Sequence, residues 1–263
     1  MVLLMTRRSL PASLLCALVF FAGCASVPPG KVTQFATIDA LLAGVYDGDF
    51  TCAQVAKNGD LGLGTFDKLD GEMVVVDGRI YQVTTDGTVR RASRSLLTPF
   101  ATVTRFKPDR AFRAGSTMNM VALERALDRV CTNPNGVYSI RIRGEFPAIK
   151  LRSVPAQREP YRKLVEVVKE QTIFPVGPNR GTLVGFRFPE YFRGINAPGY
   201  HLHFLSDDKQ SGGHVLDVTV GADSLIEIAE APQFELFFPQ SEGGFSQAAL
   251  GDDRSDELRK VER

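Results

Sequence analysis

The sequence predicts an α+β protein with mixed, mostly antiparallel β-sheets, few helices and two subdomains. Three Asp-Gly pairs, at residues 70–71, 77–78 and 86–87, separate short β-rich runs between residues 61 and 89, which is a strong signal for an antiparallel meander. Apolar and polar residues alternate over residues 137–143 and 148–154, which predicts two further half-buried strands. The composition, 44% hydrophobic and 23% charged, is that of a globular protein.

The remaining elements follow in chain order from local signals. Residues 37–43 are expected to form a brief helix, and a second helix begins at Thr51, where Gln54 completes a capping box and Gly59 supplies the stop. Pro160 is well placed in the first turn of a later helix. The other expected elements are strands at 100–106, 181–188, 200–205, 215–220, 225–229 and 234–238, and helices at 118–130 and 255–263, the last of which has a tail as its alternative.

The first 23 residues have the features of an export signal. Arg7 and Arg8 precede an apolar run over residues 10–22 that is shorter than the roughly 20 residues a membrane-spanning helix needs. Residues 21–24, Phe-Ala-Gly-Cys, resemble a bacterial lipobox, in which Cys24 is lipidated; the alternative is ordinary cleavage nearby. We therefore expect an exported protein, lipid-anchored in the periplasm or at the cell surface, or else periplasmic or secreted, whose only membrane contact is a lipid on Cys24.

The expected mature chain divides into a tether at residues 24–33, an N-terminal β-rich subdomain at 34–155 and a C-terminal metal-binding subdomain with a tail at 156–263. Removing residues 1–23 leaves 29 basic and 30 acidic residues, so the basic surplus typical of nucleic-acid binders is missing and that class is disfavoured. Cys52 and Cys131 remain in this part, either as a disulfide or as two separate thiols, and their spacing fits no zinc motif.

All three histidines of the chain, His201, His203 and His214, lie within 14 residues of one another. Residues i and i+2 of a strand point to the same face, so His201 and His203 project together. A polar turn through Gly212 and Gly213 returns the chain, so that His214 approaches the same point. Three imidazoles on a rigid hairpin suit a catalytic Zn²⁺ with an open fourth position, although manganese, iron or cobalt could substitute.

The same hairpin carries a family resemblance. Residues 199–206, Gly-Tyr-His-Leu-His-Phe-Leu-Ser, with Gly-Gly-His at 212–214, resemble the zinc-binding hairpin of bacterial alpha-acetolactate decarboxylases. The similarity continues through residues 44–49, 62–66, 69–72, 189–191 and 261–262, and so spans roughly residues 34–263. The resemblance implies a homodimer that uses Zn²⁺ to convert 2-acetolactate (2-hydroxy-2-methyl-3-oxobutanoate), a small keto acid, to acetoin and CO₂.

The resemblance also implies the roles of individual residues. It maps the family's active-site residues onto Thr65, Glu72, Arg152 and a C-terminal glutamate, for which Glu262 fits better than Glu257. The metal would stabilise the enediolate left by decarboxylation, and a carboxylic acid with a raised pKa, Glu72 or Glu262, would protonate it. Arg152 suits the departing carboxylate or the substrate hydroxyl.

Other interpretations of these residues stay open at the level of sequence. A zinc hydrolase or a cupin-like enzyme also uses three histidines, but cupins place a glutamate shortly after the first pair, and none occurs between His203 and His214. A non-enzymatic zinc-binding lipoprotein is a further alternative, and it would hold an exchangeable metal. Glu72 and Arg152 each have a plain alternative as solvated surface charges.

Overall fold

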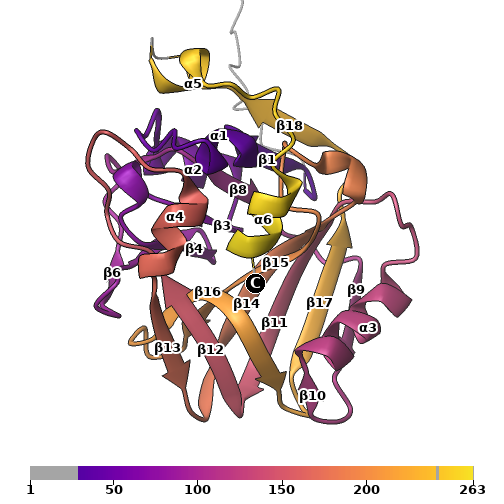
Figure 1. The fold of residues 1–263 in the computed structure, drawn as a ribbon. Helices are drawn as coiled ribbons and strands as arrows, with labels where there is room; N and C mark the ends of the chain where they lie inside the picture. Colours follow the sequence, from indigo (N-terminus) through magenta and orange to yellow (C-terminus); the bar gives the residue numbers. More distant parts are fainter. Residues whose placement is uncertain (1–28, 241–242, 263) are drawn as a thin grey trace, which may run out of the picture.

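A computed structural model describes residues 29–240 and 243–262 (Figure 1). The expected signal peptide, Cys24 and half of the expected tether, residues 24–28, lie outside these residues. Within them, none of the helices has the length and apolar character needed to cross a membrane. The described chain consists of two large sheets, one small two-stranded sheet and few helices, which confirms the predicted α+β class with mostly antiparallel sheets.

The first large sheet has seven strands in the order β18-β1-β8-β3-β4-β5-β6. Its strands β3 to β6 form the predicted meander, and the turn between β4 and β5 consists of Asp77 and Gly78 alone, both with positive φ. That backbone matches the type I′ turn which Asp-Gly favours. Strands β1 and β18 pair in parallel, whereas the sheet's other strand pairs are antiparallel. The strand bounds are β1 (Val32–Phe35), β3 (Leu61–Thr65), β4 (Glu72–Val76), β5 (Arg79–Val83), β6 (Val89–Arg91), β8 (Ala101–Thr104) and β18 (Phe234–Phe237).

The second large sheet has nine strands, eight of them in the order β13-β12-β16-β15-β14-β11-β17-β9, with β10 paired to β16. Its central strands are long, and their inward faces pack into the largest apolar cluster together with α3. The strand bounds are β9 (Arg110–Arg113), β10 (Met118–Asn119), β11 (Tyr138–Phe146), β12 (Ala148–Ser153), β13 (Thr172–Val176), β14 (Asn179–Phe188), β15 (Gly199–Ser206), β16 (Gly212–Val220) and β17 (Leu225–Glu230). Two short strands, β2 (Phe50–Thr51) and β7 (Leu97–Thr98), form the small sheet.

The helices are short, and two of them begin as predicted. Thr37 caps α1 through a bond from the amide of Ala40, and Thr51 forms the expected capping box with Gln54 at the start of α2. The helix expected to begin near Pro160 instead begins at Leu164, because residues up to Lys163 have extended or irregular backbone. The helices are α1 (Ile38–Leu42), α2 (Cys52–Asn58), α3 (Met120–Val130), α4 (Leu164–Val167), α5 (Gly244–Gln247) and α6 (Ser255–Val261), with 3₁₀ turns η1 (Asp67–Leu69), η2 (Val168–Glu170) and η3 (Glu190–Phe192).

The strands are not divided between the two sheets at the expected boundary near residue 155. Strands β9 to β12 precede that residue but belong to the nine-stranded sheet, and β18 follows it but belongs to the seven-stranded sheet. The reason is pairing between distant segments: β12 lies between β13 and β16, and β18 pairs with β1. Helices α1, α4 and α6 come from three distant parts of the chain and meet in a single apolar cluster (Figure 1).

Cys52 and Cys131 are free, buried thiols in two different apolar clusters, so they do not form the disulfide that the sequence left open. Burial raises the pKa of both thiols to about 11. At pH 8 a thiol with such a pKa is about one part in a thousand thiolate, and the thiolate is the reactive form.

We therefore expect protein lacking residues 1–24, in which Cys52 and Cys131 are the only cysteines, to resist a thiol reagent such as DTNB while folded. After denaturation without reductant, two thiols per chain should react. Absence of free thiols in the denatured, unreduced protein would instead show that the two cysteines are oxidised.

Candidate metal centre

The three histidines lie on the adjacent antiparallel strands β15 and β16. His203 and His214 are directly opposite each other in the ladder, and His201 lies two residues before His203 on the same face. The intervening Leu202 and the following Phe204 point to the other face and are buried in the main apolar cluster. The alternation predicted from the sequence is therefore present, with one face of β15 in the core and the other in a cavity.

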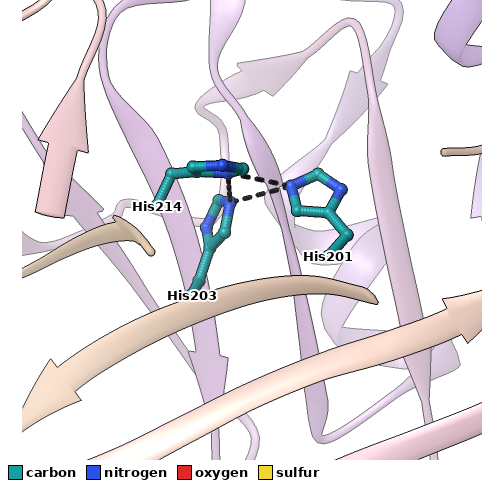
Figure 2. Close-up of side chains that lie close together, drawn as sticks. All are labelled: His201, His203 and His214. Carbon is teal, nitrogen blue, oxygen red and sulfur yellow. Dashed lines mark hydrogen bonds between the residues drawn. The ribbon is translucent and has the colours of Figure 1, made fainter. Parts of the chain in front are cut away.

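The ring nitrogens converge on one point, as Figure 2 shows. The Nε2 atom of His201 lies 3.2 Å from Nε2 of His203 and 3.1 Å from Nδ1 of His214, and the third side of the triangle measures 3.3 Å. Tetrahedral zinc with Zn–N bonds of about 2.0–2.1 Å holds its ligand nitrogens about 3.3–3.4 Å apart. The observed triangle is within a few tenths of an ångström of that spacing, so these residues fit a metal ion bound by three imidazoles.

The protonation of the histidines also fits a metal. Burial lowers the pKa of His201 to about 3 and holds those of His203 and His214 well below the usual value, so all three rings are neutral. The Nδ1–H of His203 donates to the carbonyl oxygen of Met73 at 2.8 Å, which leaves the lone pair of Nε2 facing the centre. A backbone carbonyl on the second nitrogen is the usual way in which proteins orient a metal-binding histidine.

A glycine and a bulge bring Arg152 beside His214. Gly213 has φ +137°, and a Cβ at that position would stand 2.5 Å from the carbonyl oxygen of Arg152, so β12 can approach β16 this closely only at a glycine. The register between the two strands shifts after Lys150, so that Arg152 pairs with His214. Such bulges re-aim side chains and are common beside active sites.

Glu72 and Thr65 enter the cavity from the seven-stranded sheet, where they are cross-strand neighbours on β4 and β3. The Oε2 atom of Glu72 lies 3.7 Å from Nε2 of His203, the nitrogen that faces the centre. Thr65 donates its hydroxyl hydrogen to the carbonyl oxygen of Gly71 at 2.7 Å, which ties down the turn immediately before Glu72. Glu72 is only 6% exposed, so its interpretation as a solvated surface charge is wrong.

Glu262 approaches from the end of α6. Its Oε2 atom lies 3.7 Å from Nδ1 of His201, the nitrogen that faces away from the centre, and within the described residues neither atom has a hydrogen-bond partner. The preceding residue, Val261, accepts a hydrogen bond at its carbonyl oxygen from Nη1 of Arg152. Glu257 is on the same helix but pairs with Lys163 and does not line the cavity, so of the two candidate glutamates it is Glu262 that reaches the site.

Arg152 is 4% exposed, which rules out the surface-charge interpretation for this residue too. Besides Val261 it contacts Oε1 of Gln171 at 3.3 Å, and its Nε has no partner among the described residues. Burial raises the pKa of both Glu72 and Glu262 to about 7, the Arg152 guanidinium opposes this, and Glu262 adds to the rise at Glu72. The cavity thus contains one buried cation and two carboxyl groups that are partly protonated near neutral pH.

The rest of the cavity wall is apolar and was not predicted from the sequence. It comes mainly from helices α1, α4 and α6, from the 3₁₀ turns η1 and η2, and from the loop that carries Phe100. No short motif marks these residues, since each looks like an ordinary core side chain. The apolar lining residues are Ile38, Leu41, Leu69, Phe100, Val154, Leu164, Val168 and Val261.

Comparison with known proteins decides the family. The family model described as alpha-acetolactate decarboxylase matches residues 32–252, which is most of the chain. The chain belongs to the alpha-acetolactate decarboxylase family. The matched range contains six of the seven polar residues of the cavity, namely Thr65, Glu72, Arg152 and the three histidines. The seventh, Glu262, lies beyond the end of the match.

Individual family members are similar over nearly the whole described chain. The alpha-acetolactate decarboxylase of Methanosarcina mazei is 45% identical over 231 residues, covering 88% of this chain and 79% of that protein. The Bacillus subtilis member is 38% identical over 219 residues, covering 83% and 86% of the two chains. A crystal structure of alpha-acetolactate decarboxylase from Bacillus subtilis strain 168 has a TM-score of 0.85 at 37% identity and covers 88% of this chain and 99% of that one.

Proposed function

We propose that this member of the family decarboxylates 2-acetolactate to acetoin and CO₂ with Zn²⁺ bound by His201, His203 and His214. The observation that carries the proposal is the content of one cavity: three convergent neutral imidazoles, a buried arginine and two buried carboxyl groups in a chain of this family. Bound there, the metal supplies Lewis-acid stabilisation of the negative charge that develops on the substrate's ketone oxygen.

Arg152 recruits the substrate. Its guanidinium is buried and positively charged, and its Nε donor has no partner within the described part of the chain, so it offers a charge-assisted hydrogen bond to a carboxylate or hydroxyl oxygen. When the bond to the carboxylate carbon breaks, CO₂ leaves and the electron pair passes into the enolate. CO₂ is neutral, so it lacks the ionic attraction to Arg152 that held the carboxylate. This difference favours its release.

Glu72 donates the proton that completes the reaction. Its carboxyl oxygen lies 3.7 Å from the metal-facing nitrogen of His203, so it borders the space where the substrate's reacting carbon is held. Protonation of that carbon from a single direction yields acetoin of one handedness. Thr65 holds the turn before Glu72 in place through its bond to Gly71.

Glu262 has a different position and therefore a different role. It faces the outer nitrogen of His201, and carboxylates in this place orient metal-binding imidazoles and raise their basicity. It also brings its negative charge close to Glu72, which favours the protonated form of Glu72 that the reaction requires.

The remaining proposals concern the cellular setting. We propose that residues 1–23 direct export, that Cys24 carries a lipid, and that the protein functions as a homodimer. The support for export and lipidation is the sequence of the leader, and the support for the dimer is the family resemblance.

The decisive experiment is acetoin production from racemic acetolactate by purified residues 25–263, measured before chelation, after chelation and after Zn²⁺ is restored. We expect acetoin formation to be lost with the chelator and to return with zinc. Folded, metal-loaded protein that makes no acetoin would contradict the decarboxylase, and full activity after verified metal removal would contradict the metal's role.

A further inference from the structure

The position of Glu262 depends on α6, a helix of only seven residues. Helices this short are not stable in water by themselves, so tertiary contacts must set where α6 lies. Leu258 and Val261 pack into the apolar cluster that also contains residues of α1 and α4. Apolar contacts are non-directional, and they define a helix's register less strictly than a buried polar contact does.

Arg254, the N-cap residue of α6, supplies such a polar contact. Its carbonyl oxygen accepts the amide hydrogen of Leu258 at 2.9 Å, and its side chain is only 6% exposed. Nη1 lies 2.6 Å from Oδ2 of Asp39, whose side chain is 8% exposed. Nη2 donates to the carbonyl oxygen of Ala249 at 2.5 Å and lies 3.2 Å from a carboxylate oxygen of Asp252.

Asp39 belongs to α1, the helix that also contributes Ile38 and Leu41 to the cavity wall. The buried ion pair between Arg254 and Asp39 therefore joins α6 to α1. These two helices come from opposite ends of the described chain, and both line the cavity. At the other end of α6, Arg152 of the site bonds to the carbonyl oxygen of Val261. The helix is thus fixed by one charged contact at each end, although neither Arg254 nor Asp39 lines the cavity.

The pair is suited to fixing position rather than to adding stability. Burial raises the pKa of Asp39 although Arg254 opposes this, so a large part of the Coulomb attraction is offset by desolvation. Removing Arg254 would leave Asp39 as a buried charge without this partner, which is strongly unfavourable. Another ion pair joins α6 to a distant segment, Lys163 with Glu257 at 3.1 Å, but it is half exposed at the lysine and is a weaker constraint.

We propose that Arg254, held by Asp39, is a positioning residue that fixes the register of α6 and thereby places Glu262 against His201. The inference rests on the proposed function of Glu262. A shift of α6 by a fraction of a turn moves the carboxylate away from Nδ1 of His201 and moves the Val261 carbonyl away from Arg152. Such misplacements of about 1 Å cost on the order of 100-fold in rate.

The test compares Arg254→Met with Arg259→Met in the purified protein. Arg259 is an exposed arginine on the same helix that pairs with Asp256 one turn earlier, so it controls for loss of a charge from α6. We expect Arg254→Met to lower kcat roughly 100-fold and to speed amide hydrogen exchange over residues 255–262, with exchange in β11 and β14 unchanged. Arg259→Met should stay within about twofold of the wild type, and Arg254→Lys, which retains a charge for Asp39, should recover part of the activity.

Epistasis with Glu262 separates positioning from general damage. In a Glu262→Gln background, Arg254→Met should cost far less than in the wild type, because the group that it positions is already disabled. The same fold-loss in both backgrounds, or unchanged amide exchange in α6, would overturn the proposal. If Arg254→Met does not fold, Arg254→Lys and Asp39→Asn take its place in the same comparison. Wild-type protein without acetoin formation would instead count against the proposed function, while the exchange data would still test the role of Arg254.

Discussion

Replacing His203 with alanine is expected to abolish metal binding and acetoin formation together. The change removes the nitrogen whose lone pair faces the centre and leaves two imidazoles, and it deprives the Met73 carbonyl of its donor. Loss of a partner outside the ligand shell already costs 10–100-fold in metal affinity, so loss of a ligand should exceed about 100-fold. Metal titration and metal content per chain measure the first effect, and the acetoin assay measures the second.

Thermal unfolding provides an independent measurement for the same variant. A metal at 100 times its dissociation constant stabilises a folded protein by about 2.7 kcal/mol, and this gain should disappear in His203→Ala. Tyr200→Phe is the matched control, because it alters the same strand but removes only a hydroxyl bond to Asp128 outside the cavity. A His203→Ala protein that retains the metal content of the wild type would show that the metal binds elsewhere.

Replacing Glu72 with glutamine is expected to preserve the metal and lower kcat by about 10²–10⁴-fold, the range typical of a lost general acid. The amide has nearly the size of the carboxyl group but has no acidic proton to transfer. Glu72 lies 3.7 Å from the metal-facing nitrogen of His203, and among the described residues it makes no ion pair with the outer nitrogen of a metal-binding histidine. Metal affinity and KM should therefore change little. Steady-state kinetics at known metal occupancy test this separation of kcat from binding.

The handedness of the product gives a second test of Glu72. If water replaces Glu72 as the proton source, both faces of the enolate become accessible, and the residual acetoin should be more nearly racemic. Asp70→Asn is the control, since Asp70 lies two residues earlier, outside the cavity, beside Arg90. Normal turnover by Glu72→Gln would assign the proton transfer to another group, and Glu262→Gln assayed in parallel would show whether it is Glu262.

Features that depend on local periodicity could be predicted from the amino-acid sequence alone. Alternation along residues 200–205 predicted that His201 and His203 share a face and that Leu202 and Phe204 occupy the other, and both are confirmed. The Asp77-Gly78 turn and the Thr51 capping box were also predicted correctly, because each depends on the backbone preferences of two to four adjacent residues. These patterns need no information about distant parts of the chain.

The polar residues of the cavity outside the hairpin were anticipated through the family resemblance, not through their own patterns. Nothing local distinguishes Glu72 from a solvated turn residue or Arg152 from an exposed charge on an alternating strand. Their burial follows from the approach of β4 and β12 to the histidine hairpin, and the approach of β12 requires Gly213 and the shifted register after Lys150.

Which strands are neighbours and which elements close the cavity depend on contacts between distant parts of the chain. Period-two alternation gives the face of a side chain but not its partner strand, so it could not reveal that β18 lies beside β1 or that β9 to β12 join the nine-stranded sheet. Likewise, the mostly polar segment at the end of the chain gave no sign that α6 would pack against α1 and α4. That placement arises from two buried apolar side chains and one buried ion pair between residues 215 positions apart, and such long-range contacts exist only once the chain is folded.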